Sequence, residues 1–456
     1  MTPVSEEPHP ASFRDPAGYV FRRDGVVYRR VLPEGHAEYR RLMGGGLYAA
    51  ATSEGLLLPH EEIGGGLLRP EQLPFVSYPY EWSFGQWRDA ALVTLALQSR
   101  ALDFGMSLKD ASAFNIQFSG GKPLTIDTLS FETYREGEPW VAYRQFCEHF
   151  LAPLALMAYT DIRLGSLFRS YLDGIPLSLA AKLLPLSARL NLSLLAHIFV
   201  QSGFQEAGES TGFHRAPAPM PLLNLRALLD NLQTAVKSLR WEPTGTVWAD
   251  YYEGGTNYSG AAMTAKETLV AQYLDEIAPL TSVWDIGAND ARFSRLASGR
   301  GVPTVAFDID PAAVERAYRD VRRNNETHLL PLLTDLTNPS PDQGWAHAER
   351  MSLAARGPAD AVIALALVHH LAIGNNVPLP RISAYFAQLA RRFLLIEFVP
   401  KEDSQTARLL RSRRDIFPAY TQAGFEAAFG ADFETVRVDA IPGTVRTLYL
   451  FRNGVK

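Results

Sequence analysis

The stretch from Val283 to Leu296 reads VWDIGANDARFSRL, and it decides the fold of the C-terminal half. A short apolar run typical of a buried strand leads into Gly287, and a segment with helical character begins near Ala291. Glycine takes positive φ without penalty, so Gly287 permits the sharp turn that a strand-to-helix connection needs. Asn289 stands where dinucleotide-binding loops carry another glycine, and asparagine also visits the left-handed region. The missing later glycines favour a cofactor without a phosphate.

Strands and helices alternate after this turn, which predicts βαβ units and a parallel sheet covered on both faces. Five strands are expected, at residues 282–287, 304–308, 328–335, 359–367 and 392–399. The helices between them are expected at residues 291–298, 311–324, 345–355 and 380–391. After a further helix around residues 420–429, FETVRVDA and RTLYLFR are close enough to pair as a terminal antiparallel hairpin. The C-terminal half is therefore expected to be a Rossmann-like α/β fold with seven strands.

Composition limits the function classes that the chain can serve. It has 456 residues, more than one core usually supports, and a formal net charge of -5. We therefore expect no global basic field for nucleic acid. The single cysteine excludes an internal disulfide, and no run of eighteen apolar residues is long enough to span a bilayer. We expect a cytoplasmic protein without a membrane partner.

The order of elements from Trp248 to Asn453 resembles the class I S-adenosylmethionine-dependent methyltransferases. The resemblance implies that Asp285, Gly287 and Asn289 form the first cofactor loop. It also implies that Asp308 accepts hydrogen bonds from both ribose hydroxyls, and that Asp335 accepts from the adenine amino group. These three aspartates follow three successive strands, and ligands of open α/β sheets bind outside the carboxyl ends of the strands.

The segment before the sheet, ADYYEGGTNYSGAAMTAKETLVAQYL, is rich in tyrosine and continues into an amphipathic helix that carries Lys266. In related methyltransferases such a segment covers the cofactor, and an aromatic or cationic residue there can meet the methionine carboxylate. The resemblance gives this role to Tyr258. The alternative is that these tyrosines are packing aromatics with solvated hydroxyls.

Candidates for catalysis follow the fourth and fifth strands. His369 and His370 lie where the family often carries acceptor-facing groups, and a neutral imidazole can take a proton from an attacking hydroxyl or amine. Glu397, at the end of the fifth strand, is the second candidate base. Adjacent histidines diverge, and no further ligand spacing is visible, so no metal site is expected. The histidines could equally pack and bond the backbone.

The N-terminal half has a different texture, and three domains are expected, at residues 1–139, 140–245 and 246–456. The first is an α+β module, with a hairpin at residues 18–32 around Asp24-Gly25 and a helix at residues 83–102. The second is rich in leucine and alanine and is expected to be helical.

Asp110, Asn115 and Asp127 match the spacing of the catalytic Asp, the metal-binding Asn and the metal-binding Asp in aminoglycoside-phosphotransferase-like kinases. The resemblance covers roughly residues 75–131. No His or Arg precedes Asp110, and no clear glycine loop with its lysine lies upstream. We therefore favour a kinase-derived module that has lost phosphoryl transfer and recognises the acceptor.

Considered whole, the chain also resembles the nodulation-protein NoeA-type methyltransferases of bacteria. The expected function is transfer of a methyl group from S-adenosyl-L-methionine to an O or N atom of a small-molecule or glycoconjugate acceptor. Two alternatives stay open: a small-molecule phosphotransferase that uses the N-terminal motif, and a non-catalytic cofactor-binding protein.

Overall fold

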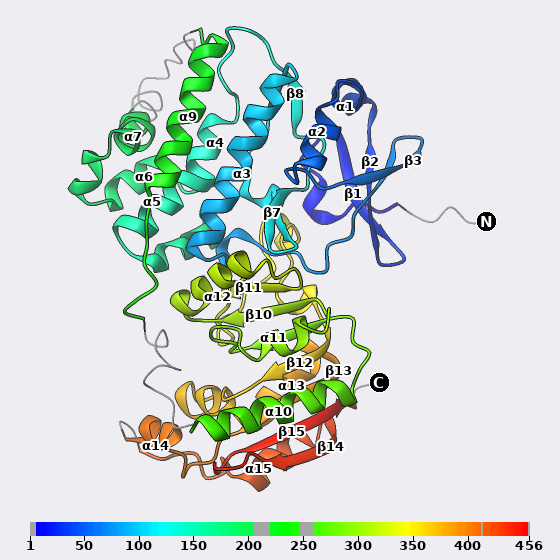
Figure 1. Ribbon diagram of the computed structural model, residues 1–456, viewed down its shortest axis with the longest axis vertical. Coiled ribbons are helices and arrows are strands. Elements are labelled where there is room, and N and C mark those ends of the chain that lie inside the picture. The colour runs from blue at the N-terminus through cyan, green and yellow to red at the C-terminus, as the bar shows by residue number, and fades with distance from the viewer. Residues whose placement is uncertain (1–5, 204–218, 247–258, 412–413, 455–456) are drawn as a thin grey trace. The chain divides into compact units, whose positions relative to one another are not determined.

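The computed structural model describes residues 6–203, 219–246, 259–411 and 414–454. The chain divides into two compact units (Figure 1). The first comprises residues 1–242 and 343–350, and the second comprises residues 243–342 and 351–456. The second unit begins close to the expected boundary at residue 246. Both expected N-terminal domains lie in the first unit, and their separation into two domains stays a prediction.

The first unit opens with a four-stranded antiparallel sheet in the order β1-β2-β4-β3. Asp24 and Gly25 both have positive φ, at 52° and 79°, and form the tight turn that joins β1 to β2. The expected N-terminal hairpin is thus present. The strands are β1 (Gly18–Arg23), β2 (Val26–Val31), β3 (His60–Gly64) and β4 (Leu67–Pro70), and the first helices are α1 (His36–Gly44) and α2 (Leu47–Ser53).

Helix α3 (Phe84–Asp103) is the longest described helix of the first unit. Ser83 precedes it as the N-cap, and its hydroxyl accepts from the Gln86 amide in a capping box. Two small antiparallel pairs follow it, β5 (Met106–Leu108) with β8 (Phe131–Thr133) and β6 (Ile116–Ser119) with β7 (Lys122–Thr125). The region beyond residue 140 is helical, as expected. Its elements are α4 (Tyr143–Phe146), η5 (Cys147–Leu151), α5 (Ala152–Tyr159), η6 (Ile162–Arg169), α6 (Leu177–Leu183), η7 (Leu186–Leu190), α7 (Leu192–Leu194), η8 (Leu195–Val200) and α9 (Leu222–Ser238).

The second unit is built on a seven-stranded sheet in the order β11-β10-β9-β12-β13-β15-β14. The first five strands are parallel, and the terminal pair is antiparallel, as the sequence led us to expect. The strands are β9 (Val283–Ile286), β10 (Thr304–Asp308), β11 (Leu329–Leu333), β12 (Ala359–Ala364), β13 (Ala390–Phe398), β14 (Phe433–Ala440) and β15 (Thr447–Asn453). This is a Rossmann-like α/β fold.

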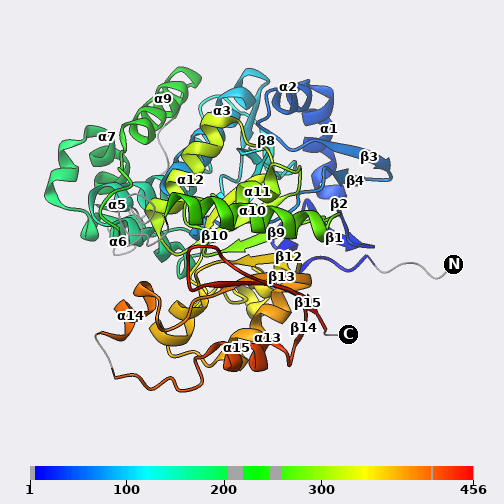
Figure 2. The same cartoon turned by 60° about the horizontal axis from the view of Figure 1, so that its bottom comes forward.

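Helices cover both faces of this sheet (Figure 2). One face carries α10 (Gly260–Glu276), α11 (Ser294–Ser298) and α12 (Pro311–Asn324), and the other carries α13 (Leu379–Leu389) and α15 (Gln422–Phe429). The connection after β13 also contains α14 (Ser404–Leu410). The core of the unit is apolar, and it includes Val270, Ile363, Leu395 and Leu450, each fully or almost fully buried. The strand order reverses beside β9, and because β9, β10 and β12 are parallel, their carboxyl ends meet at one edge of the sheet.

The prediction of a helix at residues 345–355 is wrong. The structure has only two short turns there, at Trp345–His347 and Ala354–Arg356, and both Ala346 and His347 have positive φ. Residues 343–350 belong to the first unit, in which Arg350 lies 4.0 Å from the centroid of the Phe114 ring. Contacts distant in sequence therefore override the local helical pattern.

Candidate active site

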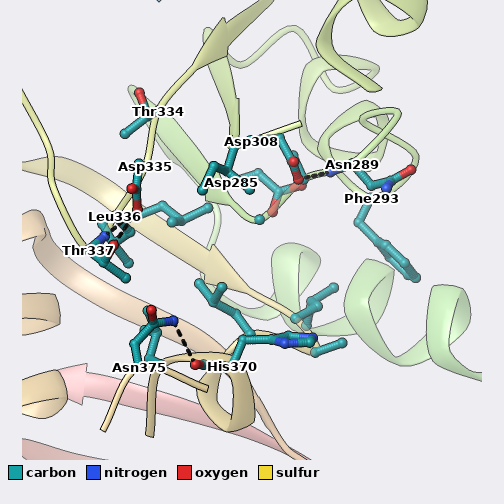
Figure 3. A pocket seen from close by; sticks show the side chains of 18 of the residues that line it. Asp285, Asn289, Phe293, Asp308, Thr334, Asp335, Leu336, Thr337, His370 and Asn375 are labelled. Carbon is teal, nitrogen blue, oxygen red and sulfur yellow. Dashed lines mark hydrogen bonds between the residues drawn. The ribbon is translucent and has the colours of Figure 1, made fainter. Parts of the chain in front are cut away.

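A cavity of about 240 Å³ lies at the carboxyl ends of the parallel strands in the second unit. Figure 3 shows Asp285, Asn289 and Asp308 on one side of it, the loop from Thr334 to Thr337 on another, and His370 with Asn375 opposite. All of the predicted cofactor-binding residues in the described ranges line this cavity. Tyr258 lies outside the described residues, so its predicted role stays a prediction.

The first loop is held by the neighbouring strand. Backbone amides of Gly287 and Ala288 both donate to the carbonyl oxygen of Phe307, at 2.8 and 3.0 Å. Gly287 has φ of 80°, Asn289 has 51° and Ala291 has 65°. The expectation that Asn289 takes a left-handed conformation is therefore confirmed, and Ala291 adopts it as well. A non-glycine residue in this region is strained, typically by about 1 kcal/mol or more.

Asp308, at the end of β10, is buried and accepts hydrogen bonds on both oxygens. Its Oδ2 accepts from the Asn289 amide at 2.7 Å, and its Oδ1 accepts from the Asp310 amide at 2.8 Å. No cation pairs with it among the described residues. Burial therefore raises the pKa of Asp308 to about 6. Each carboxylate oxygen keeps a lone pair for a further donor.

Asp285, at the end of β9, is 2% exposed, and its Oδ2 accepts from the Ser294 hydroxyl at 2.6 Å. Burial, together with the charge of Asp308, raises the pKa of Asp285 to about 7. Asp335, after β11, is less buried and accepts at Oδ1 from both the amide and the hydroxyl of Thr337, at 2.8 and 2.6 Å. The structure thus brings together three carboxylates that span 50 positions of the sequence, from Asp285 to Asp335.

The two histidines lie in the connection that follows β12, with their ring centroids 4.1 Å apart. His370 lines the cavity and begins the short helix η12 (His370–Gly374), whereas His369 is 1% exposed and lies behind it. Burial lowers the pKa of His370 to about 4, and Arg446 acts in the same direction. Burial also lowers the pKa of His369 well below its ordinary value. Both imidazoles are therefore neutral near pH 7.

Glu397 is fully buried in β13 and is not among the residues that line the cavity. Its Oε2 contacts Lys266 Nζ at 2.6 Å and accepts from the Ala366 amide at 2.9 Å, while its Oε1 contacts Arg446 Nη1 at 3.2 Å. A carboxylate held by two cations has little tendency to take a proton. This arrangement argues against the predicted role of Glu397 as a general base.

The same contacts form a buried chain of four charges, Lys266, Glu397, Arg446 and Asp403. Arg446 is 1% exposed and binds Asp403 with two nitrogens, at 2.8 and 3.1 Å. Lys266 on α10 is the only one of the four that lines the cavity, and its Nζ lies 4.7 Å from the centroid of the Phe293 ring. Burial lowers the pKa of Lys266, and Glu397 opposes that shift. Among these four charged residues, Lys266 is therefore the one that presents a positive group to the cavity.

The first unit brings Asp110, Asn115 and Asp127 together, but it occupies them with its own side chains. Arg29 from β2 forms an ion pair with Asp127, whose Oδ2 accepts from the Ser130 hydroxyl at 2.6 Å. Burial opposes ionisation of Asp127, yet Arg29 and Ser130 hold its pKa below the ordinary value. Burial and the charge of Asp127 raise the pKa of Asp110, whose Oδ1 accepts from Gln145 Nε2 at 2.8 Å.

Within the described ranges, no group of three or more His, Cys, Asp or Glu side chains is arranged to hold a metal ion. Among the described helices, none is both long and apolar enough to cross a membrane.

Nodulation protein NoeA of Rhizobium meliloti (strain 1021) is 37% identical to the chain over 470 residues, which cover 98% of the chain and 97% of the relative. The chain belongs to the NoeA family. No model of a known protein family matches the sequence. The resemblance to NoeA extends over both units of this NoeA-family chain. The first cofactor loop, from Asp285 to Asn289, lies in the second unit alone.

Several solved structures resemble part of the NoeA-family chain. Magnesium protoporphyrin IX methyltransferase (ChlM) from Synechocystis PCC 6803, with bound SAH, is 20% identical, with a TM-score of 0.32 over 45% of this chain and 91% of its own. N-methyltransferase NodS from Bradyrhizobium japonicum WM9 is 13% identical, with a TM-score of 0.31 over 43% and 98%. WbdD with the kinase inhibitor LY294002 is 15% identical, with a TM-score of 0.33 over 48% and 46%.

Proposed function

We propose that the second unit is a methyltransferase that uses S-adenosyl-L-methionine. The observation that carries this proposal is Asp308. It is a buried carboxylate at the end of the second strand, with acceptor capacity on both oxygens and, among the residues that the structure describes, no cation to neutralise it. Such a group is costly to bury unless a ligand supplies donors, and a ribose diol supplies two. The cofactor provides an electrophilic methyl group on its sulfonium when it is bound.

The other residues around the cavity fit the parts of the same cofactor. Asp335, partly exposed at the third strand end, is suited to accept from the adenine amino group, and Gly287 lets the backbone of the first loop approach the ligand. Lys266 offers a positive charge for the methionine carboxylate, with Glu397 fixing the position of its ammonium. We therefore assign to Glu397 the role of positioning the Lys266 ammonium, and we assign the general base to another group.

For the acceptor we propose an oxygen or nitrogen atom of a small molecule or glycoconjugate. His370 lies across the cavity from Asp308 (Figure 3), and its neutral ring has a lone pair that can receive the acceptor's proton. Because its pKa is about 4, His370 gains a proton only transiently, and most of the rate enhancement would come from alignment of the acceptor with the methyl group.

Methyl transfer can be tested by incubating the protein with S-adenosylmethionine and small-molecule or glycoconjugate extracts, and by measuring S-adenosylhomocysteine. We expect its formation to depend on both the extract and the protein, and to be lost in Asp308→Ala. Retained turnover in that variant would place the cofactor elsewhere. Cofactor binding without turnover in any extract would favour the non-catalytic alternative.

A further inference from the structure

The buried charges of Lys266, Glu397, Arg446 and Asp403 alternate in sign and come from four places in the second unit. Lys266 lies in α10, Glu397 in β13, Asp403 just before α14, and Arg446 just before β15. Each of these side chains is at most 3% exposed. We call the four residues the buried charge network. Since Lys266 is the member that lines the cofactor cavity, the other three act on a bound ligand through Lys266 or through their electric field.

Glu397 divides its two carboxylate oxygens between the two cations of the buried charge network. Its Oε2 accepts from Lys266 Nζ at 2.6 Å, and its Oε1 accepts from Arg446 Nη1 at 3.2 Å. A carboxylate that is shared in this way neutralises each of its partners only in part. Lys266 therefore presents more positive charge to the cavity than it would present in a closed pair with Glu397.

Arg446 is held in place through both its backbone and its side chain. Its amide donates to Thr444 Oγ1 at 3.1 Å, and its carbonyl oxygen accepts from the Ile441 amide at 2.9 Å. Its guanidinium donates to both oxygens of Asp403, at 2.8 and 3.1 Å. Asp403 in turn caps α14 by accepting from the Gln405 amide at 2.9 Å. The position of the guanidinium is thus set by contacts outside the cofactor cavity.

The positive charge of Arg446 acts on two residues that line the cavity, Lys266 and His370. Burial lowers the pKa of Lys266, Glu397 opposes that shift, and Arg446 adds to it. Burial lowers the pKa of His370 to about 4, and Arg446 again acts in the same direction. Asp403 is one ion pair farther from the cavity than Arg446, so its negative charge cancels this field only in part. The buried charge network therefore contributes a positive potential to the cavity.

We propose that Arg446 is a positioning residue for the cofactor. By pairing with one oxygen of Glu397, it leaves the Lys266 ammonium only partly neutralised and strengthens the contact of Lys266 with the carboxylate of S-adenosyl-L-methionine. This proposal rests on the proposed function and on the role of Lys266 in it. Asp403 has the opposite effect, because it competes with Glu397 for the guanidinium. If the network only stabilised the fold, loss of either charge would act in the same direction.

Calorimetric titration of the full-length protein with S-adenosylhomocysteine tests this proposal. In Arg446→Gln, Glu397 pairs with Lys266 alone, so the affinity for S-adenosylhomocysteine should fall by about fivefold. In Asp403→Asn, the guanidinium loses one anion and interacts more strongly with Glu397, so the affinity should rise by about twofold. Asparagine is also a good N-cap, so α14 keeps its cap in this variant.

A second ligand and two further variants separate the electrostatic effect from an effect on folding. The ligand 5′-methylthioadenosine keeps the adenosine part and lacks the carboxylate, so its affinity should not change in any variant. Arg452→Gln, in β15 and in an exposed ion pair with Glu434, is the matched control and should bind both ligands like the parent. The double variant Arg446→Gln with Asp403→Asn removes both outer charges together, which decides the question if a single variant does not fold. Its affinity for S-adenosylhomocysteine should fall by about threefold.

Three outcomes would overturn the proposal while the parent protein still binds S-adenosylhomocysteine. One is an equal fall in affinity in both single variants, because a purely structural role would produce it. Another is a parallel loss of affinity for 5′-methylthioadenosine, and the third is a double variant that binds S-adenosylhomocysteine like the parent. Failure of the parent protein to bind S-adenosylhomocysteine would refute the proposed function and this proposal with it, so the two kinds of failure are distinguishable.

Discussion

Each unit brings aspartates together in the fold, but the two units differ in whether a cation neutralises the negative charge. In the second unit, Asp285 and Asp308 are buried beside a cavity with no ion-pair partner among the described residues, and their pKa values rise to about 7 and about 6. In the first unit, Asp127 is neutralised by Arg29 and its pKa falls. Unneutralised charge at a cavity marks a place for a ligand, whereas an internal ion pair closes the site.

This difference bears on the choice between the two enzyme classes. A phosphotransferase of the kind that the spacing of Asp110, Asn115 and Asp127 suggests would need Asp127 to bind a metal ion with its nucleotide. In this chain a guanidinium holds that carboxylate. We therefore favour the methyltransferase, while the kinase ancestry of the first unit stays a prediction.

The largest expected effect tests directly whether the aspartates of the two units differ in ligand binding. Asp308→Ala removes two charge-assisted hydrogen bonds to the ribose, so affinity for S-adenosylhomocysteine should fall by roughly 3 kcal/mol or more. Asp127→Ala is the matched control in the other unit and should leave that affinity unchanged. Isothermal titration calorimetry measures both variants. Equal losses in the two variants would mean that the aspartates of both units serve one site.

The next effect concerns the positive group at the cavity. Lys266→Met alone leaves Glu397 buried without one of its partners, so the double variant Lys266→Met with Glu397→Gln is the better test. We expect affinity for S-adenosylhomocysteine to fall by about 2 kcal/mol, because a charge-assisted contact to its carboxylate is lost. Affinity for 5′-methylthioadenosine, which lacks that carboxylate, should not change. A parallel loss for both ligands would refute the assignment of Lys266.

In the first unit, Arg29→Met should lower the free energy of unfolding by about 2 kcal/mol, since it leaves Asp127 buried without its cation. The side chains of this pair are 16% and 14% exposed, so the cost is smaller than for a fully buried pair. Thermal denaturation measures the change, with Arg69→Met, in an exposed ion pair with Glu61, as the control. No change in the melting temperature would mean that the ion pair does not close the site.

The pKa values predict opposite pH trends for binding and stability. A protonated Asp308 accepts fewer hydrogen bonds, so binding of S-adenosylhomocysteine should weaken by about tenfold as the pH falls through 6. Asp285 has a raised folded pKa, so its contribution to stability is full below its unfolded pKa and is lost as the pH rises through about 7. Calorimetry of binding and thermal melts of the free protein measure the two trends. Binding that strengthens at acid pH would contradict the ribose contact.

The smallest effect concerns strain in the first loop. Ala291 has φ of 65° and is fully buried, so Ala291→Gly should stabilise the protein by roughly 0.5 kcal/mol, as relieved strain is partly offset by the flexibility of glycine in the unfolded chain. Chemical denaturation measures this difference. The matching change Ala288→Gly, at a buried alanine of the same loop without positive φ, should destabilise the protein instead.

The sequence allowed the strands of the second unit and the acidic strand ends to be predicted, because both depend on local patterns. Helix α12 has the bounds predicted for it, residues 311–324, because Asp310 caps it and Pro311 begins it. The helix predicted at residues 345–355 is absent because residues 343–350 belong to the first unit, whereas residues 351–355 belong to the second.

Interactions between distant residues could not be predicted in the same way. Lys266 and Glu397 are 131 positions apart, and no local signal indicated that Glu397 would be held by two cations rather than act as a base. Arg446 begins the stretch RTLYLFR, in which the local pattern indicated a terminal strand and no buried ion pair. Arg29 likewise lies in a hairpin strand 98 positions before Asp127. In both units the partner that sets the chemistry of a carboxylate comes from another element of the fold.

The most direct test of the account is calorimetric titration of the parent protein with S-adenosylhomocysteine and, separately, with Mg-ATP. We expect one S-adenosylhomocysteine to bind per chain and no heat from Mg-ATP, because Asp308 is open to a ligand and Asp127 is closed by Arg29. Binding of Mg-ATP without binding of S-adenosylhomocysteine would contradict the account and transfer the chemistry to Asp110 and Asp127.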